Sequence, residues 1–426
     1  MICRLAALTL LIIAILAGAL SAQSSKFVSV RGYQLYLSGK PYYFVGTNYW
    51  YGGLLGLEKD KRRGIQRLRR ELDFLKANGV TNLRLMAGAE GSGPMNGVTR
   101  VGPPLQPEQS RFDGSVLDGL DLVLHEMSKR QMKAVIFFSN NWEWSGGFQQ
   151  YLIWNGVIDR KWLTAKPSWD ELRDITAKFY SCEPCIAAYC KQIAFVVGRV
   201  NRYNRRKYTD DATIMAWEIA NEPRPMRPAA NDDYARFIAE TAAAVKVRDS
   251  RHLVTIGHEG WIGSESNAVY KKIHEDPNID YLTIHIWPKN WGWFRPGKMA
   301  EDYSTVEEKT RAYLAIHIAD AAMLDKPLVI EEFGLPRDGG SFDPAAPTTF
   351  RDRYFGFILS HIKQSPHVAG ADFWAFGGTA RPIKGQMFWK AGDERMGDPP
   401  MEEQGLNTVF DSDVSTWRVI RAASAR

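Results

Sequence analysis

Short apolar runs and amphipathic stretches alternate along most of the chain. Eight runs are rich in Val, Ile and Leu and predict strands, at residues 42–46, 81–86, 133–138, 213–219, 253–256, 281–285, 327–330 and 368–376. The stretches between them have helical spacing and predict helices, at residues 65–77, 116–130, 186–202, 234–247, 269–273, 306–324 and 350–362. A last helix is expected within residues 406–426. Near the start, residues 27–40 predict a β-hairpin with its turn at Arg31-Gly32, in a position to plug one end of a barrel.

The predicted strands are apolar on both faces, as parallel strands buried between helices are. Eight such strands alternating with helices predict an α/β fold of the (β/α)8 TIM-barrel type, with the short N-terminal β-hairpin in front of it. A doubly wound open sheet is the alternative, and it would carry a Gly-rich phosphate-binding turn after its first strand. That position instead has the sequence Gly46-Thr47-Asn48-Tyr49-Trp50-Tyr51, which favours the barrel.

The first 22 residues have the pattern of a secretory signal peptide. Arg4 precedes an apolar run from Leu5 to Leu20, and small residues around Ala22 suit cleavage. A membrane anchor is the alternative, but the run is near the lower limit for crossing a bilayer and no basic cluster follows it. We therefore expect residues 23–426 to form a single exported domain, extracellular or periplasmic, with no membrane attachment after cleavage.

Composition and charge narrow the class of protein. The 426 residues are 45% hydrophobic and 24% charged, which is ordinary for a soluble domain and excludes disorder for the bulk of the chain. The formal net charge is only +6, and no long Lys/Arg run is interleaved with aromatic residues, so we expect no nucleic-acid partner. The 14 Trp residues are many for this length, and some are expected to face a ligand.

Cys182, Cys185 and Cys190 are the cysteines that follow the predicted leader. The Cys-x-x-Cys spacing fits a local disulfide, a redox pair or half of a metal site. No His lies close in sequence to complete a zinc site. A short disulfide or simple packing at the start of a helix is the favoured interpretation, and the pairing stays open.

Polar side chains gather at the predicted strand ends, where a (β/α)8 barrel carries its chemistry. In chain order they are Asn48 and Trp50; Arg84; Asn140 and Trp142; Glu218, Asn221 and Glu222; His258 and Glu259; His285 and Trp287; Glu331 and Glu332; and Asp372 and Trp374. Carboxyl groups thus follow the fourth and seventh strands, which lie across the ring from each other. Glycoside hydrolysis needs one protonated and one ionised carboxyl group, so the pattern predicts a glycosidase site.

Each of these residues also has a purely structural interpretation. Arg84, between two leucines, would be a costly buried charge unless a carboxylate pairs with it. A lone His285 is commonly a satisfied core histidine, and the tryptophans could be core residues, although several lie in polar loops. Glu331 and Glu332 are adjacent, so in a regular strand only one of them faces the barrel interior, and the pattern does not choose between them.

These residues resemble glycoside hydrolase family 5, in particular its β-mannanase subfamily. The specific matches are Trp217-Glu218-Ile219-Ala220-Asn221-Glu222-Pro223, His285-Ile286-Trp287-Pro288, Glu331-Glu332-Phe333-Gly334 and Trp374. The mannanase character comes from Asn48-Tyr49-Trp50-Tyr51, from Asn140-Asn141-Trp142 with Gly146-Gly147, and from Tyr208-Thr209-Asp210-Asp211. The likeness runs from about residue 27 to about residue 376.

The resemblance implies a secreted retaining hydrolase of β-1,4-mannosidic bonds, acting on mannan, galactomannan or glucomannan, as a monomer without metal or organic cofactor. It implies Glu222 as acid/base and Glu332, which precedes aromatic-Gly, as nucleophile. The substrate-binding residues that it implies are Trp50, Arg84, Trp142, Asn221, His285, Trp287 and Trp374. Many family members have Tyr where this chain has Trp287, so the usual hydrogen bond from that Tyr to the nucleophile is in question.

Other functions remain as alternatives. An exo-acting β-mannosidase or mannobiohydrolase, or an endoglucanase, would use the same chemistry. Residues 149–166 and 380–403 are predicted to be long loop-rich insertions that could cap the cleft, and the sequence does not decide between endo and exo action. A non-catalytic carbohydrate-binding barrel is disfavoured because both carboxyl groups are present.

Overall fold

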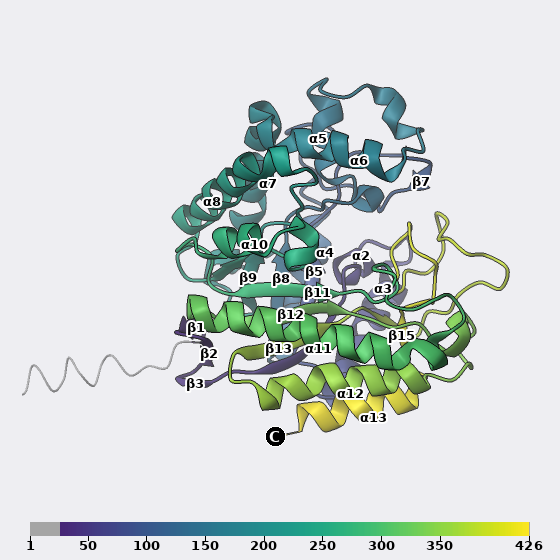
Figure 1. Cartoon of the computed structure of the whole chain (residues 1–426). Helices are drawn as coiled ribbons and strands as arrows, with labels where there is room; N and C mark the ends of the chain where they lie inside the picture. Colours follow the sequence, from purple (N-terminus) through teal and green to yellow (C-terminus); the bar gives the residue numbers. More distant parts are fainter. Residues whose placement is uncertain (1–25, 426) are drawn as a thin grey trace, which may run out of the picture.

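The computed structural model describes residues 26–425 and has a (β/α)8 barrel as its core (Figure 1). Its parallel strands lie in the order β10-β9-β8-β5-β4-β13-β12-β11. Their bounds are β4 Phe44–Asn48, β5 Asn82–Met86, β8 Lys133–Phe137, β9 Ile214–Glu218, β10 Leu253–Thr255, β11 Leu282–Ile286, β12 Leu328–Phe333 and β13 Val368–Phe373. The backbone N–H of Asp280 donates to Val254 O at 2.8 Å, which joins the β10 and β11 ends of the sheet.

Helices cover the outside of this sheet. The longer ones are α3 Lys61–Ala77, α4 Leu117–Lys129, α7 Glu183–Val197, α8 Asn231–Arg248, α10 Asn267–His274, α11 Met299–Leu324, α12 Thr349–Gln364 and α13 Val414–Ser424. The residues of the eight strands are almost all buried, which confirms the expectation drawn from their apolar runs. The predicted (β/α)8 fold is therefore correct, and the strand bounds differ from the predicted ones by at most three residues.

The predicted hairpin is present and closes the bottom of the barrel. Strands β1 Val28–Arg31 and β2 Gln34–Leu37 pair antiparallel, and β3 Lys40–Pro41 adds to them. Val28 and Leu35 pack into a cluster with inward side chains from the strand starts, among them Val135, Met215 and Val329. This plug leaves the opposite end of the barrel, where the strands terminate, for the site.

One loop prediction and one strand prediction need correction. The segment 149–166 is not all loop, because α5 Gly147–Trp154 and a short 3-10 turn, Arg160–Leu163, lie there. The run 368–376 is not one strand, because β13 ends at Phe373 and β14 Phe376–Gly378 pairs instead with β15 Val409–Phe410. That small pair forms the base of residues 380–407, an irregular segment that lies over the strand ends.

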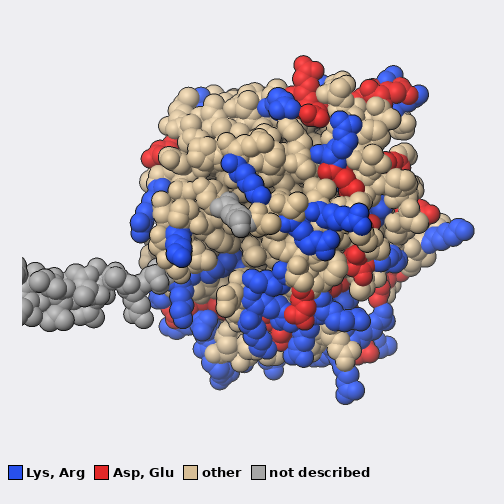
Figure 2. All heavy atoms as spheres, turned by 90° about the horizontal axis from the view of Figure 1, so that it is seen from below, with Lys and Arg blue, Asp and Glu red and all other residues tan. Residues whose placement is uncertain are grey.

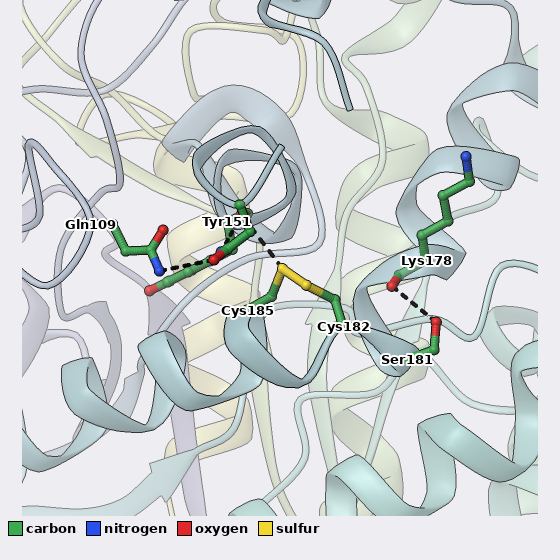
Figure 3. Close-up of a disulfide and its surroundings, with 7 residues drawn as sticks. Gln109, Tyr151, Lys178, Ser181, Cys182 and Cys185 are labelled. Carbon is green, nitrogen blue, oxygen red and sulfur yellow. Dashed lines mark hydrogen bonds between the residues drawn. A yellow bond between two sulfur atoms is a disulfide. The ribbon is translucent and has the colours of Figure 1, made fainter. Parts of the chain in front are cut away.

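Cys182 and Cys185 form a disulfide at the start of α7, so the local-disulfide interpretation is correct (Figure 3). The Cys185 sulfur contacts the carbonyl oxygen of Tyr151 at 3.5 Å, which places the bridge against α5. Cys190, half-buried, is a free thiol.

The positive charge is unevenly spread over the surface. Lys and Arg predominate over the lower half of the face in Figure 2. Helix α3 alone exposes Lys61, Arg62, Arg63, Arg69, Arg70 and Lys76, with Asp73 as its exposed acid. The expectation of no nucleic-acid partner stays a prediction.

No helix within residues 26–425 is both long enough and apolar enough to cross a membrane. The predicted leader, residues 1–22, lies outside the described residues.

Candidate active site

Glu222 and Glu332 lie together in a cavity of about 650 Å³ at the strand ends of the barrel. Of the residues singled out in the sequence, those that line this cavity are Trp142, Asn221, Glu222, Glu259, Trp287, Glu332 and Trp374. One carboxyl oxygen of Glu222, one of Glu332 and a ring nitrogen of His285 all lie within 4.8 Å of one another. The two carboxyl groups therefore sit close enough to flank a single bond of a bound ligand.

Glu222 is placed by an uncommon backbone conformation just beyond β9. Its φ of 51° is left-handed, a region that costs a non-Gly residue about 1–2 kcal/mol and that the surrounding contacts must therefore enforce. Trp142 Nε1 donates to Glu222 Oε2 at 2.5 Å, and His285 Nδ1 lies 2.7 Å from Oε1. Burial raises the pKa of Glu222 above its ordinary value, and the nearby Arg224 opposes that rise.

Glu332 reaches the same cavity because β12 is irregular. The β11–β12 ladder pairs Ile284 with Ile330 and then His285 with Glu332, so Glu331 is an extra residue in β12. Such a bulge lets two consecutive side chains point to one side of a sheet. Both glutamates consequently lie inside the barrel near Arg84, which corrects the expectation that only one would.

Arg84 is the fully buried cation at the centre of the barrel. Its guanidinium binds Glu218 in a bidentate manner, at 2.8 and 2.5 Å, and also donates to Glu332. It donates further to Asn48 at 2.9 Å and to Asn221 at 2.8 Å. The carboxyl groups of Glu218, Glu331 and Glu332 keep the pKa of Arg84 well above its ordinary value despite burial. The predicted pairing of this buried charge is thus present.

Glu222 and Glu332 differ in their partners. Burial raises the pKa of Glu222 and raises that of Glu332 well above its ordinary value, and the direct Arg84 contact opposes the rise at Glu332. Trp287 Nε1 also donates to Glu332 Oε2, at 3.1 Å, so both oxygens of Glu332 accept a hydrogen bond from a nitrogen. The direct contact with the Arg84 guanidinium, which Glu222 lacks, favours the ionised form at Glu332.

The sequence profile of glycoside hydrolase family 5 β-mannosidase-like proteins matches residues 25–426. The chain belongs to this family. A mannan endo-1,4-β-mannosidase of Arabidopsis thaliana is 30% identical over 368 residues, 82% of this chain and 78% of that protein. A family 5 mannosidase from Rhizomucor miehei is 30% identical, with a TM-score of 0.83 over 93% of this chain and 96% of that one. An endo-1,4-β-mannanase from the same fungus has the same fold, at 21% identity and a TM-score of 0.65 over 94% of this chain and all of that one.

Three residues of this family 5 protein that the sequence suggested for substrate binding do not line the cavity. Arg84 and His285 are buried behind its wall, where they contact Glu332 and Glu222. Trp50 is buried against Trp144, and its Nε1 donates to Gly397 O at 2.7 Å. Its indole therefore anchors the segment 380–407 instead of facing a ligand.

Sequence reasoning missed part of the lining. Arg224 forms an ion pair with Glu259, and its guanidinium lies 5.0 Å from the ring centre of Trp142 and 5.9 Å from that of the exposed Trp169. The segment 380–407 contributes Phe388, Met401, Glu402, Glu403, Leu406 and Asn407. Arg224 follows the Asn-Glu-Pro motif directly and could have been found from that position, whereas the loop residues carry no pattern.

Proposed function

We propose that this protein is a retaining glycoside hydrolase that cleaves β-1,4-mannosidic bonds in mannan-type polysaccharides. The observation that carries the proposal is the pair Glu222 and Glu332, whose nearest oxygens lie within 4.8 Å and whose hydrogen-bond partners differ. Retaining enzymes hold their two carboxyl groups about 5–5.5 Å apart, whereas inverting enzymes leave about 6.5–9.5 Å for a water molecule. Mannan as substrate is supported by the mannan endo-1,4-β-mannosidases among its relatives.

In the proposed mechanism Glu332 attacks the anomeric carbon while Glu222 protonates the departing glycosidic oxygen. The bond between that carbon and the leaving oxygen breaks as the ester bond to Glu332 forms. Glu222, now ionised, removes a proton from water and becomes protonated again. The oxygen of that water attacks the anomeric carbon and displaces the Glu332 carboxylate. Because every proton comes from Glu222 or water, the mechanism requires no metal ion or organic cofactor.

The neighbouring side chains fit this division of roles. The Arg84 guanidinium and the Trp287 N–H hold the charge of the nucleophile before attack. Asn221 lines the cavity beside both carboxyl groups, where an amide suits a sugar hydroxyl, and Trp374 offers an aromatic face to a sugar ring. Trp287 thus supplies the donor that Tyr supplies in many family members.

The first candidate for the mode of cleavage is endo action, as in the plant relatives. One observation favours a second candidate, exo action: the segment 380–407 lines one side of the cavity, and Glu403 in it forms an ion pair with Lys289 from the loop after β11. A covered cleft admits the end of a chain more easily than its middle. A mutant of the family 5 mannosidase of Rhizomucor miehei has been crystallised with mannosyl-fructose, a short ligand.

The test is to incubate the protein with unbranched mannan, galactomannan and soluble β-glucan and to follow product sizes over time. Mixed oligosaccharides from mannan at early times support endo action, and mannose or mannobiose as the sole early product supports exo action. The first anomer released, read by proton NMR, should be the β-form. The folded Glu332→Ala variant should lose activity by several orders of magnitude. An α-anomer, activity on glucan alone or a fully active Glu332→Ala would each contradict the proposal.

We propose further that the protein is exported and acts as a monomer. The basis for export is the apolar stretch between Arg4 and Ala22, and N-terminal sequencing of the protein recovered outside the cell should begin near residue 23. Light scattering of the purified protein should give the mass of one chain. A protein retained in the cytoplasm, or a dimer in solution, would contradict these two statements.

A further inference from the structure

Asn140 follows the end of β8 and is fully buried behind the wall of the cavity. Its Oδ1 accepts two hydrogen bonds, one from the backbone N–H of Trp142 at 3.1 Å and one from Asn221 Nδ2 at 3.0 Å. Its Nδ2 donates to Ser145 Oγ at 3.2 Å. Asn140 therefore joins the loop after β8 to the residue that directly precedes Glu222.

The orientation of each amide in this contact follows from its partners. The backbone N–H of Trp142 can only donate, so the Asn140 atom beside it is the oxygen. That oxygen can only accept, so the Asn221 atom that faces it is the nitrogen. On the other side of the Asn221 amide, its oxygen accepts from the Arg84 guanidinium at 2.8 Å, and a guanidinium can only donate. An acceptor on one side and a donor on the other thus hold the Asn221 amide in a single orientation.

This orientation leaves Asn221 one donor for a ligand. Its nitrogen carries two hydrogens, and only the one directed at Asn140 has an acceptor within residues 26–425. Asn221 lines the cavity, and the Arg84 side chain that it contacts also binds Glu332. The remaining N–H therefore lies near the carbon that Glu332 attacks. The sugar hydroxyl next to that carbon is the one on carbon 2.

We propose that Asn140 is a positioning residue for this reaction. It holds the Asn221 amide so that the remaining N–H donates to the hydroxyl on carbon 2 of the sugar whose bond is cleaved. Hydrogen bonds to this hydroxyl strengthen in the transition state of glycoside hydrolysis, so the loss of one lowers kcat and not only binding. The inference rests on the proposed function in assigning Glu332 as the nucleophile.

Two substitutions at position 140 separate the acceptor oxygen from the rest of the side chain. Asn140→Leu has nearly the same shape and removes the acceptor, so nothing holds the nitrogen side of the Asn221 amide. Asn140→Asp keeps one oxygen for the Trp142 and Asn221 donors. The Ser145 hydroxyl can turn to donate to the second oxygen of that Asp. Ser145→Ala is the matched control, because it removes the other contact of Asn140 and leaves the acceptor oxygen in place.

The readout is a ratio of two kcat/KM values, one for an aryl β-mannoside and one for the same glycoside without the hydroxyl on carbon 2. Asn140 also holds the backbone of Trp142, whose indole contacts Glu222, but a disturbance there affects both substrates alike. The ratio should fall by about tenfold in Asn140→Leu and keep its wild-type value in Asn140→Asp and Ser145→Ala. It should be equally low in Asn221→Ala, and adding Asn140→Leu to that variant should lower it no further.

A folded Asn140→Leu with the wild-type ratio would overturn the inference, as would a further fall when it is added to Asn221→Ala. Should Asn140→Leu fail to fold, an Asn140→Asp ratio as low as that of Asn221→Ala would overturn it, and the wild-type ratio in Asn140→Asp would support it.

A measurement without substrate separates this inference from the proposed function, which fails if wild type hydrolyses no mannan. A crystal structure of the wild-type protein at atomic resolution distinguishes the oxygen of the Asn221 amide from its nitrogen. The nitrogen should face Asn140 Oδ1. The reverse orientation would overturn the inference whatever the protein hydrolyses.

Discussion

The indole N–H of Trp287 donates to Glu332 Oε2 at 3.1 Å, in the place where many family members have a tyrosine hydroxyl. A hydrogen bond to a charged group is worth about 1.5–3 kcal/mol. Trp287→Phe removes it and keeps most of the ring, so Glu332 loses one of the two donors that favour its ionised form. Because the nucleophile must be ionised, its raised pKa moves the acid limb of kcat/KM to higher pH. Activity at low pH should fall by about tenfold or more.

The matched control is Trp287→Tyr, whose hydroxyl reaches towards the same carboxylate and should restore part of the lost activity. Profiles of kcat/KM against pH for the three proteins give the answer, with thermal unfolding to verify folding. An acid limb that does not move in Trp287→Phe would mean that the N–H does not stabilise the charge of Glu332.

Trp142 donates a hydrogen bond to the other carboxyl group, that of Glu222. The effect of removing this donor is expected on the alkaline limb of the kcat/KM profile. Its Nε1 donates to Glu222 Oε2 at 2.5 Å, and this bond lowers the pKa of a group whose pKa burial raises. Trp142→Phe therefore raises the pKa of Glu222 further, and the alkaline limb should move to higher pH. Measured on a substrate with a good leaving group, the acid limb should stay in place. An alkaline limb that moved to lower pH would show that Trp142 acts otherwise than as a donor to Glu222.

The barrel could be predicted because its strands are buried on both faces and so form continuous apolar runs, as in β5 Asn82–Met86 and β12 Leu328–Phe333. Glu222 could be predicted because the Asn-Glu-Pro motif ends a strand. The helix α5 Gly147–Trp154 could not, because nearly all of its residues are buried and no polar face marks its period. Length and apolar content alone do not distinguish such a segment from a loop or strand.

That the side chains of both Glu331 and Glu332 point into the barrel could not be predicted from the sequence either. A regular strand alternates, and the extra residue in β12 is visible only in its pairing with β11. The course of residues 380–407 is held by isolated contacts such as that of the buried Asp398, which accepts from the backbone N–H groups of Gly405 and Thr408 and from the Thr408 hydroxyl. Contacts of this kind produce no periodic pattern in the sequence. The length of the loop could therefore be predicted, but not its position over the cavity.

The disulfide between Cys182 and Cys185 should affect stability and not catalysis. It closes a loop of only a few residues, so the loss of loop entropy predicts a contribution of about 2 kcal/mol. Replacing both cysteines by Ser should lower Tm by about 2–3 °C for a domain of this size. It should leave kcat/KM unchanged, because neither residue lines the cavity. Calorimetry and kinetics of the double variant provide the test, and a selective loss of activity at unchanged Tm would show that the bridge positions the site.

Removing the ion pair between Lys289 and Glu403 tests whether the segment 380–407 limits how substrates enter the cleft. Both side chains are partly exposed, so the pair contributes at most about 1 kcal/mol to stability, and Lys289→Ala should fold normally. If the segment covers one end of the cleft, loosening it should shift early products of mannan digestion from mannose or mannobiose towards mixed oligosaccharides. Glu403→Gln should act in the same direction, and Lys298→Ala, in the ion pair with Glu301 on the first turn of α11, is the control. Unchanged short products in both variants would mean that the cleft is closed by other parts of the lining.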